Sequence, residues 1–295
     1  MRAVVTGGTR GIGFHVAMEL RRQGYAVTVV GRDPDHGEAA VGAIGGDTRF
    51  LRADLSSLDE VRALGARLAG EGPLRLLVNN VGGMWSTRWE TVDGIEAAFA
   101  LNHLSPTVLT DALIDALKAG APSRIIEVSS SSITVVDGSP TYTEVEEGGE
   151  YYGMAVTGRA KLAHLAHALD LAERLSGSGI SVFVVDPLGP AAAATPNAAA
   201  MTPEILPPAL RGLWDEIQRG LRPAAEGARP IVAAATDPAF DGATGLVLGP
   251  DGAPSKDLLQ FLTPEISASV RALTRRVLAQ QHSPERSGTP TAQQC

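Results

Sequence analysis

The first 190 residues alternate short apolar, β-branched runs with longer stretches in which apolar side chains recur at helical spacing. Leu162, Leu165 and Leu169 show this spacing, because residues three or four apart share one face of a helix. Runs such as Leu-Leu-Val and Val-Phe-Val-Val are apolar without interruption, as expected of strands that helices cover on both sides. The pattern predicts repeated strand–helix units, and therefore an α/β fold built on a parallel sheet.

The predicted elements can be placed along the chain by their residue ranges. Strands are predicted over Arg2–Thr6, Ala26–Val30, Thr48–Arg52, Leu74–Val78, Ser123–Val128, Ile180–Asp186 and Gly245–Leu248. Helices are predicted over Ile12–Arg22, Ser57–Ala69, Asp93–Leu117, Val156–Leu175 and Ile266–Gln280. Residues 1–281 then form one domain, a doubly wound seven-stranded parallel sheet with helices on both faces.

The regular alternation stops between about residues 187 and 223, where alanine and proline dominate. A connection of this length is either a flexible linker or a functional lid. We favour a lid, because the segment follows the sixth strand and ligands bind beyond the carboxyl ends of parallel strands. Residues 282–295 carry almost no apolar side chains, and we expect them to be disordered.

Composition narrows the class of protein. Of the 295 residues, 44% are hydrophobic and 20% are charged, as in a globular chain with a core. The net charge of −8 has the wrong sign for a nucleic-acid partner. No apolar run approaches the length of a membrane span, and no signal-peptide pattern is visible. The one cysteine, Cys295, excludes an internal disulfide and a thiolate metal site, and we expect a cytoplasmic protein.

A glycine-rich segment, Thr6-Gly7-Gly8-Thr9-Arg10-Gly11-Ile12-Gly13, joins the first predicted strand to the first predicted helix. Gly7 permits a tight exit from the strand, and Gly11 allows the backbone to approach a pyrophosphate. Gly13 allows the helix and the strand to pack closely. Because unpaired N–H groups at the start of a helix favour an anion, the segment predicts a dinucleotide site.

The second predicted strand is followed by Gly31 and Arg32. A carboxylate at this place binds the ribose 2′-hydroxyl of NAD, whereas a guanidinium favours the 2′-phosphate of NADP. Arg32 therefore predicts NADP(H), with Arg10 as a second contact to the phosphate. The neighbouring Asp33 leaves open that Arg32 is simply a solvated side chain.

These motifs resemble those of the short-chain dehydrogenase/reductase family. The resemblance includes Asp54-Leu55 after the third strand and Asn79-Asn80-Val81-Gly82 after the fourth. Other motifs look like the retinol-dehydrogenase-like branch of that family, namely Leu101-Asn102-His103-Leu104, Val128-Ser129-Ser130 and Lys161-Leu162-Ala163-His164. The resemblance extends to about residue 262 through Pro223–Pro230 and Asp241–Gly245.

The resemblance implies a Rossmann-type fold, NADP(H) and a small-molecule ketone substrate. It implies cofactor contacts from Gly7, Thr9, Arg10, Gly11, Ile12, Gly13, Arg32, Asp54, Leu55, Asn79, Val81, Gly82, Lys161 and Pro187. Asp186-Pro187-Leu188-Gly189 replaces the Pro-Gly of the family, so the floor beneath the nicotinamide is expected to differ. The helices up to Val156–Leu175 form subunit contacts in many relatives, which leaves open a homo-oligomer unless the lid blocks them.

The catalytic set of the family is Asn, Ser, Tyr and Lys, and the tyrosine stands four residues before the lysine. Asn102, Ser130 and Lys161 match this set, but Thr157 occupies the place of the tyrosine. In the usual reaction the phenol, with its pKa lowered by the neighbouring ammonium, protonates the carbonyl oxygen. A threonine hydroxyl is far less acidic and reaches less far, so Thr157 does not simply replace the tyrosine.

Three functions remain open. In the first, the chain is an NADPH-dependent ketoreductase, and a phenol of the substrate beside the ketone activates the carbonyl. Ser130 would orient the oxygen and Lys161 would hold the ribose, an arrangement that resembles atypical ketoreductases of angucyclinone-type polyketide biosynthesis. In the second, Tyr142, Tyr151 or Tyr152 supplies the acid. In the third, the chain is an NADP-binding module or a non-redox catalyst such as a cyclase or an epimerase.

We favour the ketoreductase, because Ser130 faces substrate in the family and a pure nucleotide sensor has no need of it. The run from Ser129 to Ser132 also allows the simpler interpretation that Ser130 is a turn residue. His164 and His167 stand one helical turn apart, but no third ligand is placed by the sequence, so no metal is assigned. We expect both histidines on the surface of the helix or in a subunit contact.

Overall fold

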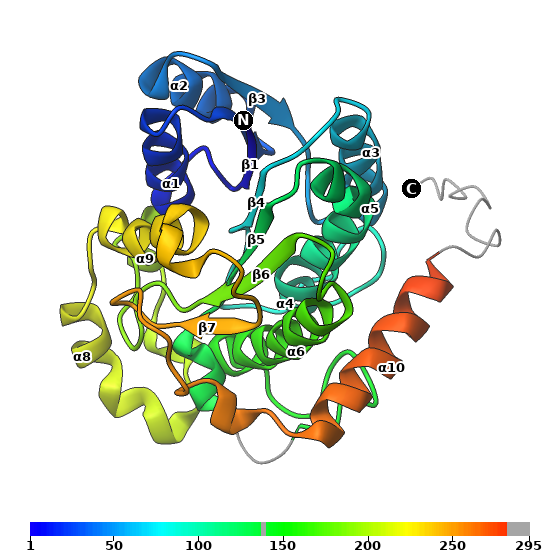
Figure 1. The fold of residues 1–295 in the computed structure, drawn as a ribbon. Coiled ribbons are helices and arrows are strands. Elements are labelled where there is room, and N and C mark those ends of the chain that lie inside the picture. The colour runs from blue at the N-terminus through cyan, green and yellow to red at the C-terminus, as the bar shows by residue number, and fades with distance from the viewer. Residues whose placement is uncertain (137–139, 282–295) are drawn as a thin grey trace, which may run out of the picture.

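The computed structural model describes residues 1–136 and 140–281, so the predicted tail over residues 282–295 lies outside the described residues (Figure 1). Its seven strands form one sheet in the order β3-β2-β1-β4-β5-β6-β7, and every neighbouring pair is parallel. The strands are β1 (Arg2–Thr6), β2 (Ala26–Gly31), β3 (Thr48–Arg52), β4 (Leu76–Asn79), β5 (Ser123–Val128), β6 (Ile180–Val185) and β7 (Leu246–Leu248). The predicted doubly wound sheet is confirmed, and its strand order reverses between β1 and β4.

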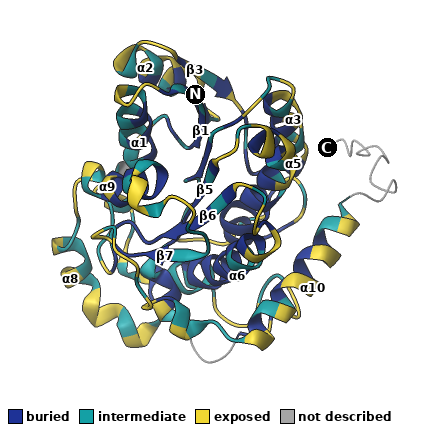
Figure 2. Cartoon of the chain, in the orientation of Figure 1, coloured by how far each residue is buried: buried dark blue, intermediate teal, exposed yellow. Residues whose placement is uncertain are grey.

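Helices cover both faces of the sheet (Figure 1). One face carries α1 (Gly11–Arg22), α2 (Pro34–Ile44) and α9 (Ala224–Thr236), and the other carries α3 (Leu58–Ala69), α5 (Ser105–Ala119) and α6 (Gly153–Arg174). The last helix, α10 (Pro264–Gln280), packs on the outer side of α6. The inner strands and the inward sides of the helices are buried, whereas the edge strand β3 is partly exposed (Figure 2).

Alternate residues of each strand belong to opposite cores, because successive side chains of a strand point to opposite faces. Val4 and Leu77 pack with α3 and α5, whereas Val5 and Val78 pack with α1 and α9. By the same alternation Asn79, two residues after Leu77, points away from α1. Glu127, two residues after Ile125, likewise points toward α5 and α6 rather than toward α1.

The predicted helix over Asp93–Leu117 is divided into three parts, and its predicted start is wrong. The helix begins as α4 (Ala97–Phe99), because the buried carboxylate of Glu96 accepts hydrogen bonds from the backbone N–H groups of Ala98 and Phe99, both at 2.8 Å. A π-helical turn, Ala100–Leu104, then precedes α5. Such turns are often found at functional sites.

The hydrophobic pattern did not predict α2 and α9, because both helices are rich in small residues. The start of α2 nevertheless carries the usual signals: Asp33 accepts a hydrogen bond from the N–H of His36 at 3.1 Å, and Pro34 occupies the first turn. In α9 the lack of a side chain at Gly227 permits contact with α1, since a Cβ there would lie 2.8 Å from Cδ1 of Ile12.

The two ends of the segment over residues 187–223 pair with each other. Arg222 donates its N–H to the carbonyl of Ala192 at 2.9 Å, and Ala194 donates to the carbonyl of Arg222 at 2.8 Å. Between these contacts lie the short helices α7 (Pro196–Ala199) and α8 (Trp214–Arg219), with 3₁₀ turns at Pro203–Ile205 and Pro208–Leu213. Ile205 and Leu206 are buried, which anchors the excursion.

No helix within residues 1–136 and 140–281 combines the length and the apolar character needed to cross a membrane.

Candidate active site

The glycine-rich segment adopts a turn that only glycine accommodates readily. Gly7 and Gly11 have φ angles of 63° and 57°, in the left-handed region. A Cβ at Gly13 would overlap the carbonyl oxygen of Gly7 and would lie 2.5 Å from Nδ2 of Asn80. The start of α1 therefore lies directly against the end of β1, as the sequence predicts.

Asn80 holds this turn, although it was not among the predicted site residues. Its Nδ2 donates to the carbonyl of Thr6 at 2.9 Å. The hydroxyl of Thr6 accepts the N–H groups of Asn80 and Val81, both at 3.0 Å. These bonds join the carboxyl ends of β1 and β4 where the strand order reverses, which is the expected ligand crevice of such a sheet.

The side chain of Asn79, a predicted cofactor contact, lies on the other face of the sheet. Its Nδ2 donates to Oγ1 of Thr110 at 2.8 Å and to Oε1 of Glu127 at 2.9 Å. The alternation along β4 explains this orientation, because Asn79 shares its face with Leu77. The side chain of Asn79 therefore does not contact the glycine-rich turn in the structure.

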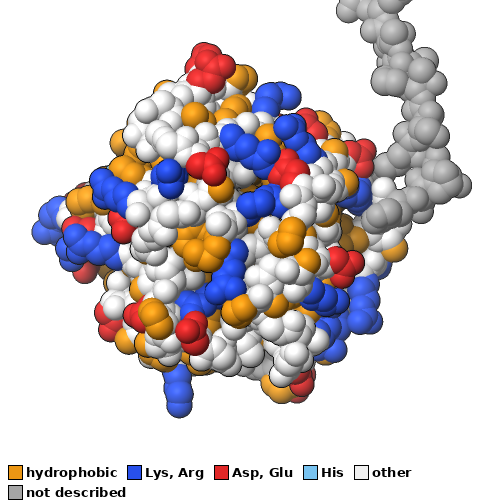
Figure 3. All heavy atoms as spheres, turned by 45° about the horizontal axis from the view of Figure 1, so that its top comes forward, with side chains coloured by type: hydrophobic (Ala, Val, Ile, Leu, Met, Phe, Trp, Pro, Cys, Tyr) orange, Lys and Arg blue, Asp and Glu red, His pale blue; other side chains and the backbone are white. Residues whose placement is uncertain are grey.

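At the end of β2, Arg32 is exposed and makes no side-chain hydrogen bond or ion pair with the described residues. Asp33 is engaged elsewhere, because it caps α2 and lies 2.8 Å from Nδ1 of His36. The capping hydrogen bond from the N–H of His36 lowers the pKa of Asp33. Arg10 is also exposed. On the face of the molecule that Figure 3 shows, Lys and Arg side chains are interspersed with Asp and Glu side chains.

The remaining predicted nucleotide contacts lie beside this crevice. Thr9 packs against the end of β2, since a Cβ on Gly31 would lie 3.0 Å from Cγ2 of Thr9. Asp54 caps the loop after β3, where its Oδ1 accepts the N–H and the hydroxyl of Ser56, and Leu55 is buried. Ile12 is half-buried and close to Gly227 of α9.

Asn102 and Thr157 meet at the backbone of Gly83, in the loop that follows β4. Asn102 donates its Nδ2 to the Gly83 carbonyl at 2.9 Å, and its Oδ1 accepts the Gly83 N–H at 3.1 Å. Thr157, which is buried, donates its hydroxyl to the same carbonyl at 3.3 Å. The Thr157 hydroxyl thus has a partner within the protein, and the π-helical turn is connected to α6 through this loop.

Lys161 lies one helical turn after Thr157 and is 6% exposed. Its Nζ donates to the carbonyl of Val128 at 2.7 Å. Burial lowers the pKa of Lys161 to about 8, while the nearby Glu127 carboxylate opposes this shift. A Cβ at Gly82 would lie 3.1 Å from Nζ and 2.5 Å from Oδ1 of Asn102, so the lack of a side chain at Gly82 lets Lys161 and Asn102 approach this loop closely.

Ser130 precedes the 3₁₀ turn Ser131–Val135 and caps it, since its Oγ accepts the N–H of Ser132 at 3.1 Å. The hydroxyl proton of Ser130 has no acceptor among the described residues. The next residue, Ser131, donates its hydroxyl to the carbonyl of Gly189. Gly189 in turn donates its N–H to the carboxylate of Asp186 at 3.2 Å, which places the buried Pro187 beside Ser131.

None of the three alternative tyrosines occupies the place of the missing phenol. Tyr142 is buried, and its hydroxyl donates to the carbonyl of Arg159 at 2.6 Å. Tyr152 donates to the carboxylate of Glu150. Burial raises the pKa of Tyr151 to about 12. Tyr151 lines a cavity of about 560 Å³, and Thr157 and Lys161 are not among its lining residues. Each phenol is therefore less acidic than usual, the opposite of what a catalytic acid needs.

Two tryptophans lie beside the Gly83 loop. Trp85 covers Gly83, because a Cβ there would lie 2.6 Å from Cη2 of its ring. Trp85 and Trp89 form an edge-to-face pair with ring centroids 5.6 Å apart, and both are partly buried in the core. Trp214, at the start of α8, belongs to the excursion over residues 187–223.

The expectation that both His164 and His167 lie on the surface of the helix is wrong for His164, which is buried, whereas His167 is half-buried and lines a cavity. Both pack beneath α10, and the buried His164 places Nε2 2.7 Å from Oε2 of Glu127. His103 lies next to both rings. Within the described part of the chain, no group of three or more His, Cys, Asp or Glu side chains has a geometry that would hold a metal ion.

Comparisons with known proteins agree with this architecture. Residues 1–143 match the family model for short chain dehydrogenases. The chain is 36% identical to mouse (Mus musculus) retinol dehydrogenase 12 over 190 residues, which make up 62% of this chain and 60% of that protein. It is 37% identical to zebrafish (Danio rerio) polyprenol dehydrogenase over 197 residues, 63% of this chain and 60% of that protein. These matches span about 60% of the length of the relatives.

Solved structures extend the similarity to most of the chain. An uncharacterized protein of Mycobacterium paratuberculosis superposes with a TM-score of 0.70 at 24% identity, covering 94% of this chain and 93% of that chain. The complex of Pseudomonas aeruginosa RhlG with NADP gives a TM-score of 0.63 at 28% identity, covering 85% of this chain and 95% of that chain. The predicted Rossmann-type fold is confirmed.

The contact between Gly13 and Gly7 yields a test of the turn. We expect Gly13→Ala to destabilise the protein by about 1–3 kcal/mol, because its Cβ must displace backbone. The matched control is Gly42→Ala in α2, where a Cβ meets no atom within 4 Å and alanine should stabilise the helix by about 0.5–1 kcal/mol. Urea unfolding of both variants measures the difference, and equal stabilities would contradict the proposed close contact.

Proposed function

We propose that the chain is a member of the short chain dehydrogenase family and that it is an NADPH-dependent ketoreductase, which reduces a carbonyl of a bulky, aromatic polyketide-like substrate. The observation that carries the proposal is the site around Thr157. The groups that surround a carbonyl in this family are retained, but the described residues offer no phenol at the place where the acid would stand. The substrate itself is the remaining source of a phenol.

NADP(H) fits the residues that line the crevice. A Cβ on Gly11 would contact only Cγ2 of Thr195, at 3.7 Å, so the backbone at the start of α1 is open to a pyrophosphate. Arg32 is free of protein partners among the described residues, whereas Asp33 is committed to α2 and to His36. This arrangement favours a 2′-phosphate over a free ribose hydroxyl. The similarity to the NADP complex of RhlG supports the same cofactor.

The bound cofactor would supply a hydride, and the protein would orient and polarise the carbonyl. Ser130 has its oxygen engaged as an acceptor and its hydroxyl proton available, so it would donate to the carbonyl oxygen. The Lys161 ammonium would hold the ribose and maintain a positive potential next to the oxygen that gains charge. Asn102 keeps the Gly83 loop in place and would therefore position the substrate indirectly.

A phenol hydrogen-bonded to the ketone would perform the part of the missing tyrosine. Its O–H polarises the carbonyl before reduction and donates the proton to the alkoxide that forms. The phenolate left on the substrate then regains its proton through the protein. Thr157 is not suited to this part, because its hydroxyl is directed to the Gly83 carbonyl and a threonine hydroxyl is a weak acid.

The segment over residues 187–223 would act as the lid over such a substrate. Its two ends pair with each other at Ala192–Ala194 and Arg222, Gly189 accepts a hydrogen bond from Ser131, and Thr195 approaches the glycine turn. Trp85, next to Gly83, and Trp214, in the segment, would stack on a planar ring system. A lid that closes on the site would exclude water during reduction.

The substrate class can be tested with pairs of aryl ketones. We expect the purified protein to oxidise NADPH with ketones that carry a phenol beside the carbonyl, and to reduce their O-methyl ethers about 100-fold more slowly, as expected when a general acid is lost. Transfer of deuterium from labelled NADPH to the product verifies reduction. NADPH binding without turnover of any ketone would favour the alternative, an NADP-binding module or a non-redox cyclase or epimerase.

Replacement of Thr157 separates the two sources of the proton. We expect Thr157→Val to lose about 1 kcal/mol of stability, because one buried hydrogen bond disappears while Asn102 still binds the Gly83 carbonyl. Turnover should stay within about threefold, whereas loss of a true general acid lowers it by about 100-fold or more. Steady-state kinetics on the best phenolic ketone decides between these results, provided that NADPH affinity is unchanged.

Cofactor choice rests on Arg32. We expect Arg32→Ala to weaken NADPH binding by about 10- to 100-fold, the effect of losing a charge-assisted hydrogen bond, and to leave NADH binding unchanged. The control is Arg22→Ala, an exposed arginine at the far end of α1 whose partner is Glu19. Calorimetric titration measures both cofactors, and an equal loss for NADPH and NADH would be incompatible with a contact to the 2′-phosphate.

A further inference from the structure

A buried polar chain begins directly behind Lys161. Glu127 is 1% exposed and lies on β5, on the face that α6 covers. One carboxylate oxygen accepts Nδ2 of Asn79 at 2.9 Å, and the other lies 2.7 Å from Nε2 of His164. The next residue of β5, Val128, provides the carbonyl that binds Nζ of Lys161. The carboxylate and the lysine thus share one segment of strand and one face of α6.

Three imidazoles continue this chain toward α10. The ring centroids of His103, His164 and His167 lie 5.9, 5.9 and 6.2 Å apart. Each ring has one buried nitrogen without a hydrogen-bond partner among the described residues: Nδ1 of His103, Nδ1 of His164 and Nε2 of His167. Unpaired nitrogens on neighbouring rings can be joined by a water molecule, which needs two to four polar partners.

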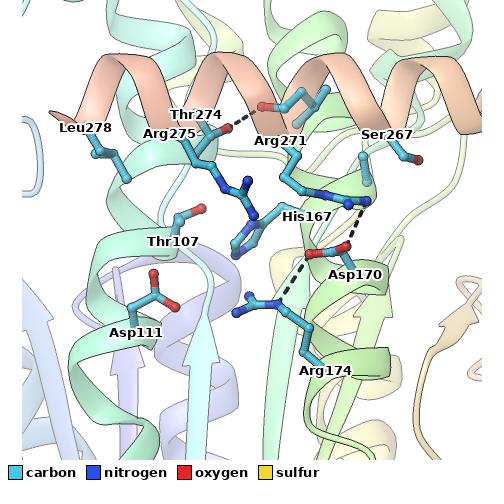
Figure 4. Close-up of a pocket in the computed structure, with 12 residues that line it drawn as sticks. Thr107, Asp111, His167, Asp170, Arg174, Ser267, Arg271, Thr274, Arg275 and Leu278 are labelled. Atoms are coloured by element: carbon cyan, nitrogen blue, oxygen red, sulfur yellow. Dashed lines mark hydrogen bonds and ion pairs between the residues drawn. The ribbon is translucent and has the colours of Figure 1, made fainter. Parts of the chain in front are cut away.

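The outer end of the chain opens into a cavity between α5, α6 and α10. The cavity has a volume of about 160 Å³, and His167 projects into it from α6 (Figure 4). Several charged side chains line its walls. Asp170 binds Arg174 at 3.3 Å and Arg271 at 3.0 Å, and Arg275 and Asp111 also line the cavity, beside apolar residues such as Val270 and Leu278. These polar groups offer hydrogen-bond partners to water that enters the cavity.

Burial keeps His167 neutral at ordinary pH. It lowers the pKa of His167 to about 4, and the neighbouring His164 and Arg174 shift it in the same direction. Burial also lowers the pKa of His103 well below its usual value. A neutral imidazole can pass a proton by accepting it at one nitrogen while the other releases one. The cluster is therefore suited to carry protons without holding a permanent charge.

We propose that Glu127, His164 and His167 form a proton path from the cavity between α5, α6 and α10 to Lys161. The path itself is inferred from the network of buried polar side chains, whereas its use in catalysis rests on the proposed function. Reduction of one carbonyl consumes one hydride and one proton. Nζ of Lys161 gives its proton to the substrate phenolate. The path then returns a proton to Nζ from the side of Glu127. Water in the cavity supplies a new proton to the path at His167.

A purely structural cluster is a weaker explanation. Each unpaired buried nitrogen costs stability that an apolar side chain of similar size would not cost. His103 has the clearest structural role of the three, because its Nε2 lies 2.7 Å from Oγ1 of Thr274 and so connects the π-helical turn to α10. His167 has no such bond within the described residues, yet it occupies the boundary between the cluster and the cavity.

The path can be tested on the free protein, without substrate. The chain has three lysines, Lys118, Lys161 and Lys256, so ¹⁵N-lysine labelling gives three ammonium signals. We expect His167→Phe to slow the exchange of the Lys161 ammonium protons with water by about 10-fold or more, the lower range of general acid–base effects. His15→Phe on α1 is the matched control and should leave the rate unchanged. An unchanged Lys161 rate in His167→Phe would overturn the path.

Further variants distinguish proton transfer from altered packing. His167→Gln keeps a polar side chain that cannot titrate, so it should slow exchange as His167→Phe does. Free imidazole should restore exchange in His167→Ala by entering the cavity. Glu127→Gln should slow exchange and lower the pKa of Lys161 further below about 8, because the charge that opposes the effect of burial is gone. Normal exchange in His167→Gln would likewise overturn the path.

The same variants separate failure of the path from failure of the proposed function. If the parent protein reduces no ketone while exchange falls in His167→Phe, the path stands and the proposed function fails. If the parent turns over and exchange does not depend on His167, the proposed function stands and the path fails. If the proposed function and the path are both correct, His167→Phe should lower turnover and raise the solvent deuterium isotope effect, with NADPH affinity unchanged.

Discussion

The backbone of Gly83 is the contact on which the geometry of the candidate site depends. Its N–H and its carbonyl are both bound by the side chain of Asn102, and the carbonyl also accepts the hydroxyl of Thr157. Three elements distant in sequence, the loop after β4, the π-helical turn and α6, are thereby joined at one peptide unit. Lys161 lies one turn along α6 from Thr157, so this junction also positions its side chain, and the lack of a side chain at Gly82 leaves space for its amine. The junction also gives threonine at position 157 a structural role.

Much of this arrangement follows from the sequence, because the interactions that produce it are local or periodic. Continuous apolar runs predict the strands of a sheet covered on both faces, and the spacing of Gly7, Gly11 and Gly13 predicts the turn between β1 and α1. The opposite orientations of Asn79 and Asn80 also follow from alternation along β4, once the strand is known to end at Asn79. The helices α2 and α9 were not predicted because contacts between small residues, such as Gly227 against Ile12, leave no periodic pattern of large apolar side chains.

The polar network behind the site could not be predicted from the sequence, for a different reason. His164 lies 37 residues from Glu127 along the chain, and His103 binds Thr274 across 171 residues. Local spacing shows only that His164 and His167 share a helix face. Whether that face meets solvent or another helix depends on α10, whose buried residues Ile266, Val270 and Leu273 hold it against the domain. The long-range packing of α10 against α6 therefore places these two histidines beneath α10 and not on the open surface of the helix.

Burial and proton supply place opposing demands on such a site. Excluding water strengthens the field of Lys161 and Ser130 at a developing alkoxide, since charges interact more strongly at low dielectric. The same exclusion removes the solvent that would otherwise replace each proton consumed. A catalytic tyrosine does not remove this requirement, because its phenol must itself be reprotonated. The same is true of a phenol on the substrate. Any reductase on this scaffold therefore needs a route from water to its lysine, and in the described structure the unpaired imidazoles between Glu127 and the α10 cavity lie along one.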